Sequence, residues 1–177
     1  MGKRSDFERV ERDFYPTPRE AVLPLLPHLA PTVNFCEPCA GDGQLIDILE
    51  SYGAKCVFAS DISPQRNDIV KADFKDLTTT QTHHATKIIT NPPWNRKILH
   101  PMIEHFRELG KGAWLLFDSD WMHTKQSTEY MPYVNKVVSV GRVKWIPDSK
   151  SVGKDNCCWY HFLPLKAYRT EFYGRTE

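Results

Sequence analysis

The stretch that decides the fold is "TVNFCEPCAGDGQLIDILESYG", residues 32–53. Its first part, 32–38, predicts a strand, and "AGDG" predicts a tight loop. Residues 44–53 predict an amphipathic helix that ends at Gly53, because glycine commonly terminates helices. Gly41 and Gly43 allow tight turning and a close approach of the backbone to a ligand. A strand, a glycine loop and a helix in this order predict a binding loop in an α/β fold.

The rest of the chain continues this alternation. Residues 20–29 predict a short kinked helix, and residues 98–112 predict a helix with a break at Pro101. Further strands are predicted at 54–62, 68–74, 87–93 and 112–121, and two late β runs at 136–146 and 156–165 should be neighbours at one edge of the sheet. The alternation predicts a Rossmann-like α/β domain: a mostly parallel sheet with an antiparallel C-terminal edge and helices on both faces. Ligands of such sheets bind beyond the carboxyl ends of the strands.

Composition indicates a soluble globular chain. The 177 residues suit one domain spanning 1–177, with 41% hydrophobic and 25% charged residues. No apolar run approaches the roughly 20 residues that span a bilayer. The charged N-terminus has no apolar segment of the signal-peptide type, so we expect a cytoplasmic protein. A net charge of +1 argues against a surface that is basic throughout.

The five cysteines raise the question of a metal site. "CEPC" (36–39) is a C-x-x-C pair that Cys157 and Cys158 could complete to four zinc ligands. Adjacent residues of a strand point to opposite faces of a sheet, so these two thiols should not converge. We therefore expect free thiols and no metal.

Acidic residues follow the first three predicted strands. Glu37 leads the glycine loop, which matches neither the G-x-G-x-x-G nor the GK[ST] phosphate-binding pattern. An acid at this place suits a ligand with an ammonium group better than a pyrophosphate. Asp61 follows Gly43 at a spacing close to that of ribose-binding carboxylates in nucleotide-binding α/β folds. Asp73 can accept from an adenine amino group, and the ring of Phe74 can cover a purine. Taken singly, Asp73 could be a loop residue and Phe74 a core residue.

A second motif, "IITNPPW" (88–94), ends the fourth predicted strand. Neither Pro92 nor Pro93 has an N–H to donate, so the strand cannot continue. Asn91 is forced toward an extended conformation by the proline that follows it. The result is a stiff backbone that carries an amide, a free carbonyl and the ring of Trp94. Such a segment can bind a flat polar group. An ordinary turn with a packed tryptophan would have the same sequence, so both interpretations are open.

Together these motifs resemble a known family. "YPTP" (15–18), "EPCAGDG" (37–43), "SDI" (60–62), "ADF" (72–74) and "NPPW" (91–94) occur in the order seen in S-adenosylmethionine-dependent amino-methyltransferases. The chain looks most like the DNA adenine-N6 methyltransferases, including small phage-type members. The resemblance covers residues 14–165, and the late "GRVKWI" with its second β run is similar to the C-terminal sheet edge of that family.

The resemblance implies roles for individual residues. Residues 1–19 would form an N-terminal segment that closes over the methionine end of the cofactor. The implied S-adenosylmethionine-binding residues are Tyr15, Thr17, Pro18, Glu37, Pro38, Cys39, Gly41, Gly43, Asp61, Ile62, Asp73, Phe74 and Asn91. The implied catalytic residues are Asn91, Pro92, Pro93 and Trp94.

The chemistry of an exocyclic amine explains why these residue types would be needed. The lone pair of adenine N6 is delocalised into the ring, so the amine is a poor nucleophile. Asn91 Oδ1 and the Pro92 carbonyl can each accept one N6 hydrogen, which localises the lone pair without a metal or a strong base. The base must lie outside a duplex stack, and Trp94 can stack on it.

Other readings stay open. The family usually has a target-recognition region, and only 121–135 and 147–156 are spare here, so DNA and RNA are both possible substrates and the target sequence is not predicted. The same motif serves an RNA guanine or a protein glutamine amide, although protein-glutamine enzymes usually carry a longer N-terminal domain. A non-catalytic cofactor- or nucleic-acid-binding module is the third hypothesis. Trp121 and Trp145 are expected to be packing residues.

Overall fold

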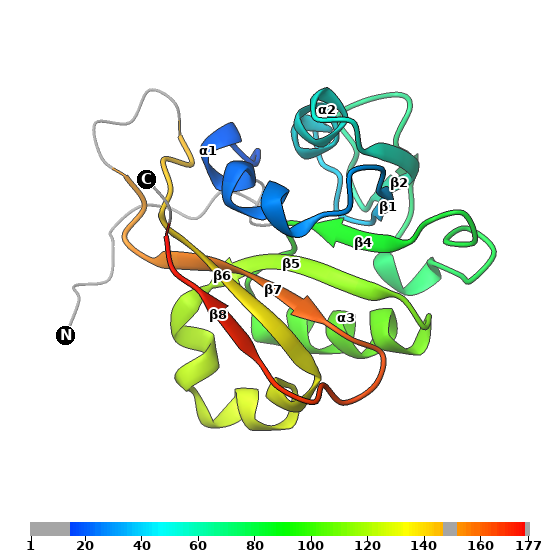
Figure 1. Cartoon of the computed structure of the whole chain (residues 1–177). Coiled ribbons are helices and arrows are strands. Elements are labelled where there is room, and N and C mark those ends of the chain that lie inside the picture. The colour runs from blue at the N-terminus through cyan, green and yellow to red at the C-terminus, as the bar shows by residue number, and fades with distance from the viewer. Residues whose placement is uncertain (1–14, 147–151, 176–177) are drawn as a thin grey trace.

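A single mixed sheet organises the molecule. The computed structural model describes residues 15–146 and 152–175. Within them the sheet has eight strands in the order β3-β2-β1-β4-β5-β7-β6-β8 (Figure 1). The strands from β3 to β5 are mutually parallel, and β7 is antiparallel to both of its neighbours. The strands are β1 (Asn34–Glu37), β2 (Lys55–Asp61), β3 (Val70–Lys71), β4 (Lys87–Thr90), β5 (Gly112–Asp118), β6 (Val134–Arg142), β7 (Asn156–Phe162) and β8 (Glu171–Tyr173).

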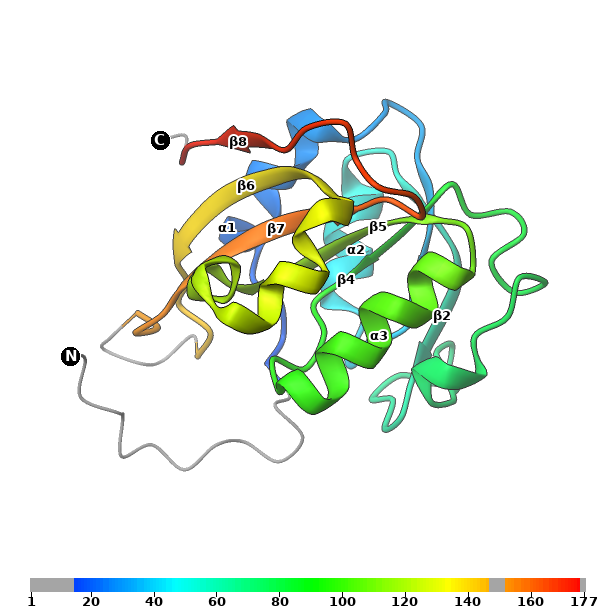
Figure 2. The ribbon, with the colours of Figure 1, turned by 90° about the horizontal axis from the view of Figure 1, so that it is seen from below.

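Helices cover both faces of this sheet. Figure 1 shows α1 and α2 on one side of the sheet and α3 on the other, and Figure 2 shows the same layers from below. The α-helices are α1 (Arg19–Val22), α2 (Gln44–Ser51) and α3 (Arg96–Glu108). The 3-10 helices are η2 (Leu23–His28), η3 (Phe74–Asp76), η4 (Ser119–His123), η5 (Lys125–Glu129) and η6 (Met131–Tyr133). No helix in the described ranges is both long and apolar enough to cross a membrane.

Each face of the sheet has its own hydrophobic core. Leu99, Met102 and Phe106 of α3 pack on one face, and Leu45 and Leu49 of α2 pack on the other. Neighbouring residues of one strand divide between the two cores, because successive side chains of a strand point to opposite faces. Both faces of the central strands are therefore buried, as is usual for parallel sheets.

The predicted fold class is confirmed, with the mostly parallel sheet and its antiparallel C-terminal part. The two late β runs are neighbours as predicted, and β8, which the sequence analysis did not anticipate, lies outside β6 and pairs parallel to it. The predicted fifth strand is shorter than expected, because 119–123 forms η4. Trp121 of η4 is fully buried, as expected of a packing residue, so η4 belongs to the core.

The expected break at Pro101 was wrong. Helix α3 runs through this residue from Arg96 to Glu108. Pro101 is exposed, and its missing N–H deprives only the Lys97 carbonyl of its intrahelical donor. The opposite stripe, including Leu99 and Phe106, is fully buried against the sheet. This packing holds the helix together across the proline.

A buried histidine makes the fold sensitive to acid. His161 of β7 stacks on Trp114 with a centroid distance of 4.5 Å, and its Nδ1 lies 2.6 Å from Asn135 Oδ1. Burial, followed by the charges of Lys87 and Lys136, lowers the pKa of His161 to about 3. Below its ordinary value of 6.5, the unfolded chain takes up a proton at His161 while the folded chain does not. The free energy of unfolding therefore falls as pH drops from 6.5 toward 3.

We predict that His161→Phe flattens this dependence, because phenylalanine keeps the stacked ring and removes the titrating group. The difference in unfolding free energy between wild type and variant should change by up to ~1.4 kcal/mol per pH unit across this window. Denaturant titrations from pH 7 to pH 4 measure it, with the exposed His83→Phe as control. Parallel curves for wild type and His161→Phe would contradict the prediction.

Candidate active site

The two sequence motifs meet at the carboxyl ends of neighbouring strands. β1 pairs in parallel with β2 on one side and with β4 on the other. The glycine loop leaves β1 and the Asn91–Trp94 motif leaves β4, so the pairing places both at one edge of the sheet. A cavity of about 860 Å³ lies between them, lined by Gly41 and Asn91 among others. This volume is within the range of small-molecule sites.

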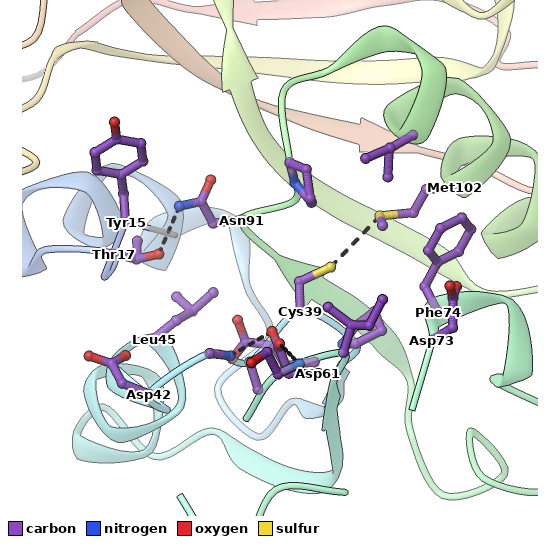
Figure 3. A pocket seen from close by; sticks show the side chains of 18 of the residues that line it. Tyr15, Thr17, Cys39, Asp42, Leu45, Asp61, Asp73, Phe74, Asn91 and Met102 are labelled. Atoms are coloured by element: carbon purple, nitrogen blue, oxygen red, sulfur yellow. Dashed lines mark hydrogen bonds between the residues drawn. The ribbon is translucent and has the colours of Figure 1, made fainter. Parts of the chain in front are cut away.

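The cavity has two distinct ends. Figure 3 shows Thr17 and Asn91 at one end and Asp73, Phe74 and Met102 at the other, with Asp61 between them. The first end is built by the segment before α1 and the loop after β4. The second end is built by the turn after β3 and one side of α3. A ligand that fills the cavity therefore spans from Asn91 to an aromatic wall.

A carboxylate fixes the glycine loop. Asp61 Oδ2 accepts from the Gly41 N–H at 2.9 Å, and Asp61 Oδ1 accepts from the Ser63 N–H at 2.7 Å. Gly41 and Gly43 have φ angles of 52° and 80°, which favour glycine. At Gly43 the positive φ strains any other residue, and a Cβ there would also displace the Arg66 guanidinium, because it would lie 2.2 Å from Arg66 Nη1. The loop is thus preformed around Asp61.

The cavity has more acidic than basic side chains, because four carboxylates line it beside Lys75 and Lys97. Glu37, Asp42, Asp61 and Asp73 all line it. Glu37 is buried, and its Oε2 has no hydrogen-bond partner among the described residues. Burial, reinforced by the charges of Asp61 and Asp42, raises the pKa of Glu37 well above its ordinary value. A buried acceptor beside other carboxylates fits a cationic ligand and repels a phosphate.

The far end of the cavity offers apolar surfaces for a flat ring. Phe74 is 9% exposed and packs edge-on against Phe106 at 6.4 Å. Ile62 lines the cavity while 56% of its surface is exposed. Asp73 Oδ1 accepts from the Lys75 N–H at 3.0 Å, which holds its carboxylate beside Phe74. Phe74 is therefore both a core residue and a wall of the cavity.

The carboxamide of Asn91 is held from two sides. Its Nδ2 donates to Thr17 Oγ1 at 3.1 Å, and its Oδ1 accepts from Trp94 Nε1 at 3.4 Å. Trp94 Nε1 also donates to the Leu116 carbonyl of β5 at 3.2 Å. Trp94 is half-buried and meets Trp145 edge-on at 5.8 Å. The indole therefore has a fixed place beside the motif.

The chain that follows the motif is also anchored. Asn95 Oδ1 accepts from the Lys97 N–H at 3.0 Å and so caps α3. Arg96 Nη2 donates to Asp118 Oδ2 at 2.8 Å, which ties the start of α3 to the end of β5. Lys97 lines the cavity instead.

Most of the residues implied by the sequence gather at this cavity. Its lining includes Tyr15, Thr17, Glu37, Pro38, Cys39, Gly41, Asp61, Ile62, Asp73, Phe74, Asn91 and Pro93. Four of the implied residues are not among those lining it: Pro18, Gly43, Pro92 and Trp94. Pro18 is the N-cap of α1, and the Pro92 side chain is buried.

Sequence reasoning missed several residues of the wall. They are Pro16, Ala40, Asp42, Leu45, Ser63, Gln65, Lys75, Asn95, Lys97, Ile98 and Met102. Seven of them lie inside a motif or within two residues of one, and Gln65 and Lys97 lie three residues beyond one, so a window of three residues around each motif would have found nine. Ile98 and Met102 carry no such signal, because the sequence predicts their helix without indicating which side of it would line a cavity.

The cysteines do not converge in the described ranges. Cys157 belongs to the core beneath α2 and Cys158 to the core beneath α3, so the two thiols point to opposite faces as predicted. Cys39 lies at the cavity, where its Sγ is 4.0 Å from Met102 Sδ. In residues 15–146 and 152–175, no group of three or more histidine, cysteine or acidic side chains is arranged to hold a metal.

Comparisons with known proteins identify the fold. No protein-family model matches the chain, and no curated protein matches its sequence. Among solved structures, a provisionally assigned class I S-adenosylmethionine-dependent methyltransferase from Listeria monocytogenes has a TM-score of 0.60 at 10% identity, over 97% of this chain and 68% of its own. A provisionally assigned RNA methyltransferase from Pyrococcus horikoshii has a TM-score of 0.58 at 16% identity, over 89% and 90%. The M protein of the type I restriction enzyme EcoKI has a TM-score of 0.55 at 12% identity, over 85% and 45%.

The chain thus has the fold of S-adenosylmethionine-dependent methyltransferases. TM-scores of 0.55–0.60 at identities of only 10–16% show a shared architecture and no more, and the substrate has to be argued from the site.

The buried acid should carry a cost in stability. Above about pH 4.5, the unfolded chain ionises Glu37 while the folded chain resists doing so, and the free energy of unfolding falls as pH rises toward the raised pKa. We predict that Glu37→Gln stabilises the protein by about 1–3 kcal/mol at pH 7.5 and by less at pH 4.5.

Thermal unfolding at the two pH values measures this effect, at about 2–4 °C per kcal/mol for a chain of this size. The exposed Glu108→Gln is the matched control for loss of a carboxylate. A destabilised Glu37→Gln, or a gain that is larger at pH 4.5, would refute the account of this group.

Proposed function

We propose that this chain is a methyltransferase that uses S-adenosylmethionine to methylate N6 of adenine in DNA. The observation that carries the proposal is that Asn91 of the NPPW motif lines the same cavity as the acidic glycine loop. A cationic cofactor and a planar amine can therefore meet in one space.

The cavity fits this cofactor. S-adenosylmethionine carries an α-ammonium group and a sulfonium, and when bound it supplies an activated methyl group. Glu37 has a buried oxygen without a hydrogen-bond partner in the described part of the chain, which suits an ammonium, and Asp61 at the end of β2 suits the ribose. Asp73 and Phe74 form the end that suits the adenine ring. The methionine end then lies toward Thr17 and Asn91 (Figure 3).

The residues after β4 act on the acceptor amine. Asn91 Oδ1 and the Pro92 carbonyl accept the two N6 hydrogens and draw the nitrogen out of conjugation with the ring. The two prolines keep this pair of acceptors in a fixed shape. The surplus proton leaves to water, so no strong base is needed. Orientation of the reactants contributes on the order of 7–11 kcal/mol at best.

The target base has to leave the helical stack to reach Asn91, at a cost of a few kcal/mol in a duplex. Trp94 repays part of this cost by stacking on the base, worth about 1–3 kcal/mol. Its ring is half-buried and packs against both hydrophobic cores, and its indole N–H is held by the Leu116 carbonyl. The fixed indole supports a rigid platform for the base.

The comparisons support a nucleic-acid substrate, since one similar fold belongs to a provisionally assigned RNA methyltransferase and another to a restriction-enzyme M protein. DNA adenine is preferred here because the whole series of motifs resembles the DNA adenine enzymes. RNA is the second candidate, because the site itself contains nothing that excludes a ribose.

The test is to incubate the protein with methyl-tritiated S-adenosylmethionine and, in separate reactions, single-stranded DNA, duplex DNA, RNA and a glutamine-containing protein. Digestion and chromatography then identify the labelled species. We expect N6-methyladenine from DNA. Label only in RNA or protein would replace the proposed substrate, and cofactor binding without any transfer would indicate a binding module.

Asn91→Ala provides a second prediction. It should lower the rate of transfer at least about a hundredfold, because a displaced acceptor spoils the reacting geometry, while the cofactor dissociation constant stays within about twofold. The exposed Asn67→Ala is the control for the substitution. Equal losses of transfer and cofactor affinity would count against the role of Asn91.

A further inference from the structure

We infer that Thr17 is a positioning residue that, together with the indole N–H of Trp94, fixes the orientation of the Asn91 carboxamide. The inference rests on the proposed function, because it concerns how Asn91 presents its oxygen to an amine. The resemblance implies only a cofactor contact for Thr17, so the hydrogen bond to Asn91 gives this residue a different task.

The oxygen and the nitrogen of a carboxamide have opposite hydrogen-bonding properties. Its oxygen accepts hydrogen bonds and its nitrogen donates them, and a rotation of 180° exchanges the two. Only the oxygen can accept a hydrogen from the target amine. A freely rotating Asn91 side chain would turn Nδ2 instead of Oδ1 toward the amine for much of the time. The reaction therefore needs neighbouring groups that select one orientation of the carboxamide.

Trp94 selects the orientation. An indole N–H is a donor only, so the Asn91 atom that faces it must be an acceptor. The structure has Asn91 Oδ1 at 3.4 Å from Trp94 Nε1, and the indole is kept in place by its bond to the Leu116 carbonyl. The reversed carboxamide would set its NH2 group against this N–H.

Thr17 binds the nitrogen end of the same carboxamide. Its hydroxyl can donate or accept, so it does not choose the orientation by itself. It accepts from Asn91 Nδ2 at 3.1 Å and so satisfies the nitrogen that the chosen orientation turns toward it. Because the indole N–H takes one acceptor site of Oδ1, the second acceptor site of that oxygen is left for the substrate.

The place of Thr17 is itself well defined. Its side chain is 5% exposed, and it stands between Pro16 and Pro18. Proline fixes one backbone angle and restricts the residue before it, so this segment is stiff. Pro18 is the N-cap of α1, whose Ala21 and Val22 are fully buried. The hydroxyl is thus anchored to the core and not to a loose chain end.

The arrangement connects the two halves of the site. The segment that contains Thr17 lines the cavity at the end that suits the methionine part of the cofactor, and the same residue holds the catalytic amide (Figure 3). A cofactor contact and a positioning contact predict different kinetic effects for loss of the hydroxyl, which makes the inference testable.

The experiment compares Thr17→Val, which keeps the shape and removes the hydroxyl, with Thr17→Ser, which keeps the hydroxyl. Thr82→Val is the matched control, because Thr82 is also fully buried and its hydroxyl bonds to the Thr78 carbonyl outside the cavity. For each protein, kcat is measured with saturating S-adenosylmethionine and an adenine-containing DNA strand. The cofactor dissociation constant is measured by calorimetry without DNA.

We expect kcat of Thr17→Val to fall about tenfold to a hundredfold, with the cofactor dissociation constant within about twofold of wild type. Thr17→Ser should recover most of kcat, and Thr82→Val should lose thermal stability but not kcat. Three results would each overturn the inference: an unchanged kcat for Thr17→Val, a weaker cofactor affinity that accounts for the whole loss, or no recovery with Thr17→Ser.

An NMR measurement that does not depend on catalysis tests this inference separately from the proposed function. The side-chain amide signals of Asn91 in a 15N NMR spectrum, assigned through their loss in Asn91→Asp, should shift and broaden in Thr17→Val and keep their positions in Thr82→Val. If the wild type makes no N6-methyladenine, the proposed function fails whatever the spectra show. If it does and the signals in Thr17→Val are unchanged, the positioning role alone fails.

Discussion

The parallel pairing of β1 with β4 is the constraint on which the site depends. The two strands are far apart in sequence, and their adjacency brings the loop after each one to the same edge of the sheet. β2, on the other side of β1, adds Asp61, whose carboxylate takes the Gly41 N–H and fixes the glycine loop. β5, next to β4, supplies the Leu116 carbonyl that holds the Trp94 indole. The glycine loop, Asp61 and the segment that contains Asn91 are therefore each positioned by a strand of the rigid sheet, as a site with exact geometric demands requires.

The site holds a buried acid whose ionisation the fold opposes. Glu37 is a buried acid beside other acids, and its Oε2 lacks a partner among the described residues. Strain of this kind is common at functional sites, where a ligand relieves it. A bound cation would stabilise the ionised form of Glu37, whereas the same carboxylates disfavour a bound phosphate. The electrostatics and the absence of a phosphate-binding pattern in the sequence thus agree on the type of ligand.

The fold could be predicted from sequence because its signals are local. Strand-like and helix-like segments alternate, and Gly41, Gly43, Pro92 and Pro93 end them sharply. The motifs also predicted most of the cavity, since each follows a strand and parallel strands align their carboxyl ends. What sequence could not give depends on tertiary contacts: the side of α3 that bears Met102, the continuity of that helix through Pro101, and β8. The link between Thr17 and Asn91 joins residues 74 positions apart, and neither motif contains a signal for it.

The central claim is that one cavity holds both a cationic cofactor and the acceptor amine. The most direct measurement is a crystal structure of the protein with sinefungin, an analogue of S-adenosylmethionine that carries an amine in place of the transferable methyl. The account predicts that its ribose meets Asp61, its adenine lies against Phe74, and its added amine points toward Asn91. Sinefungin bound elsewhere, or bound in the cavity with its amine directed away from Asn91, would contradict the account.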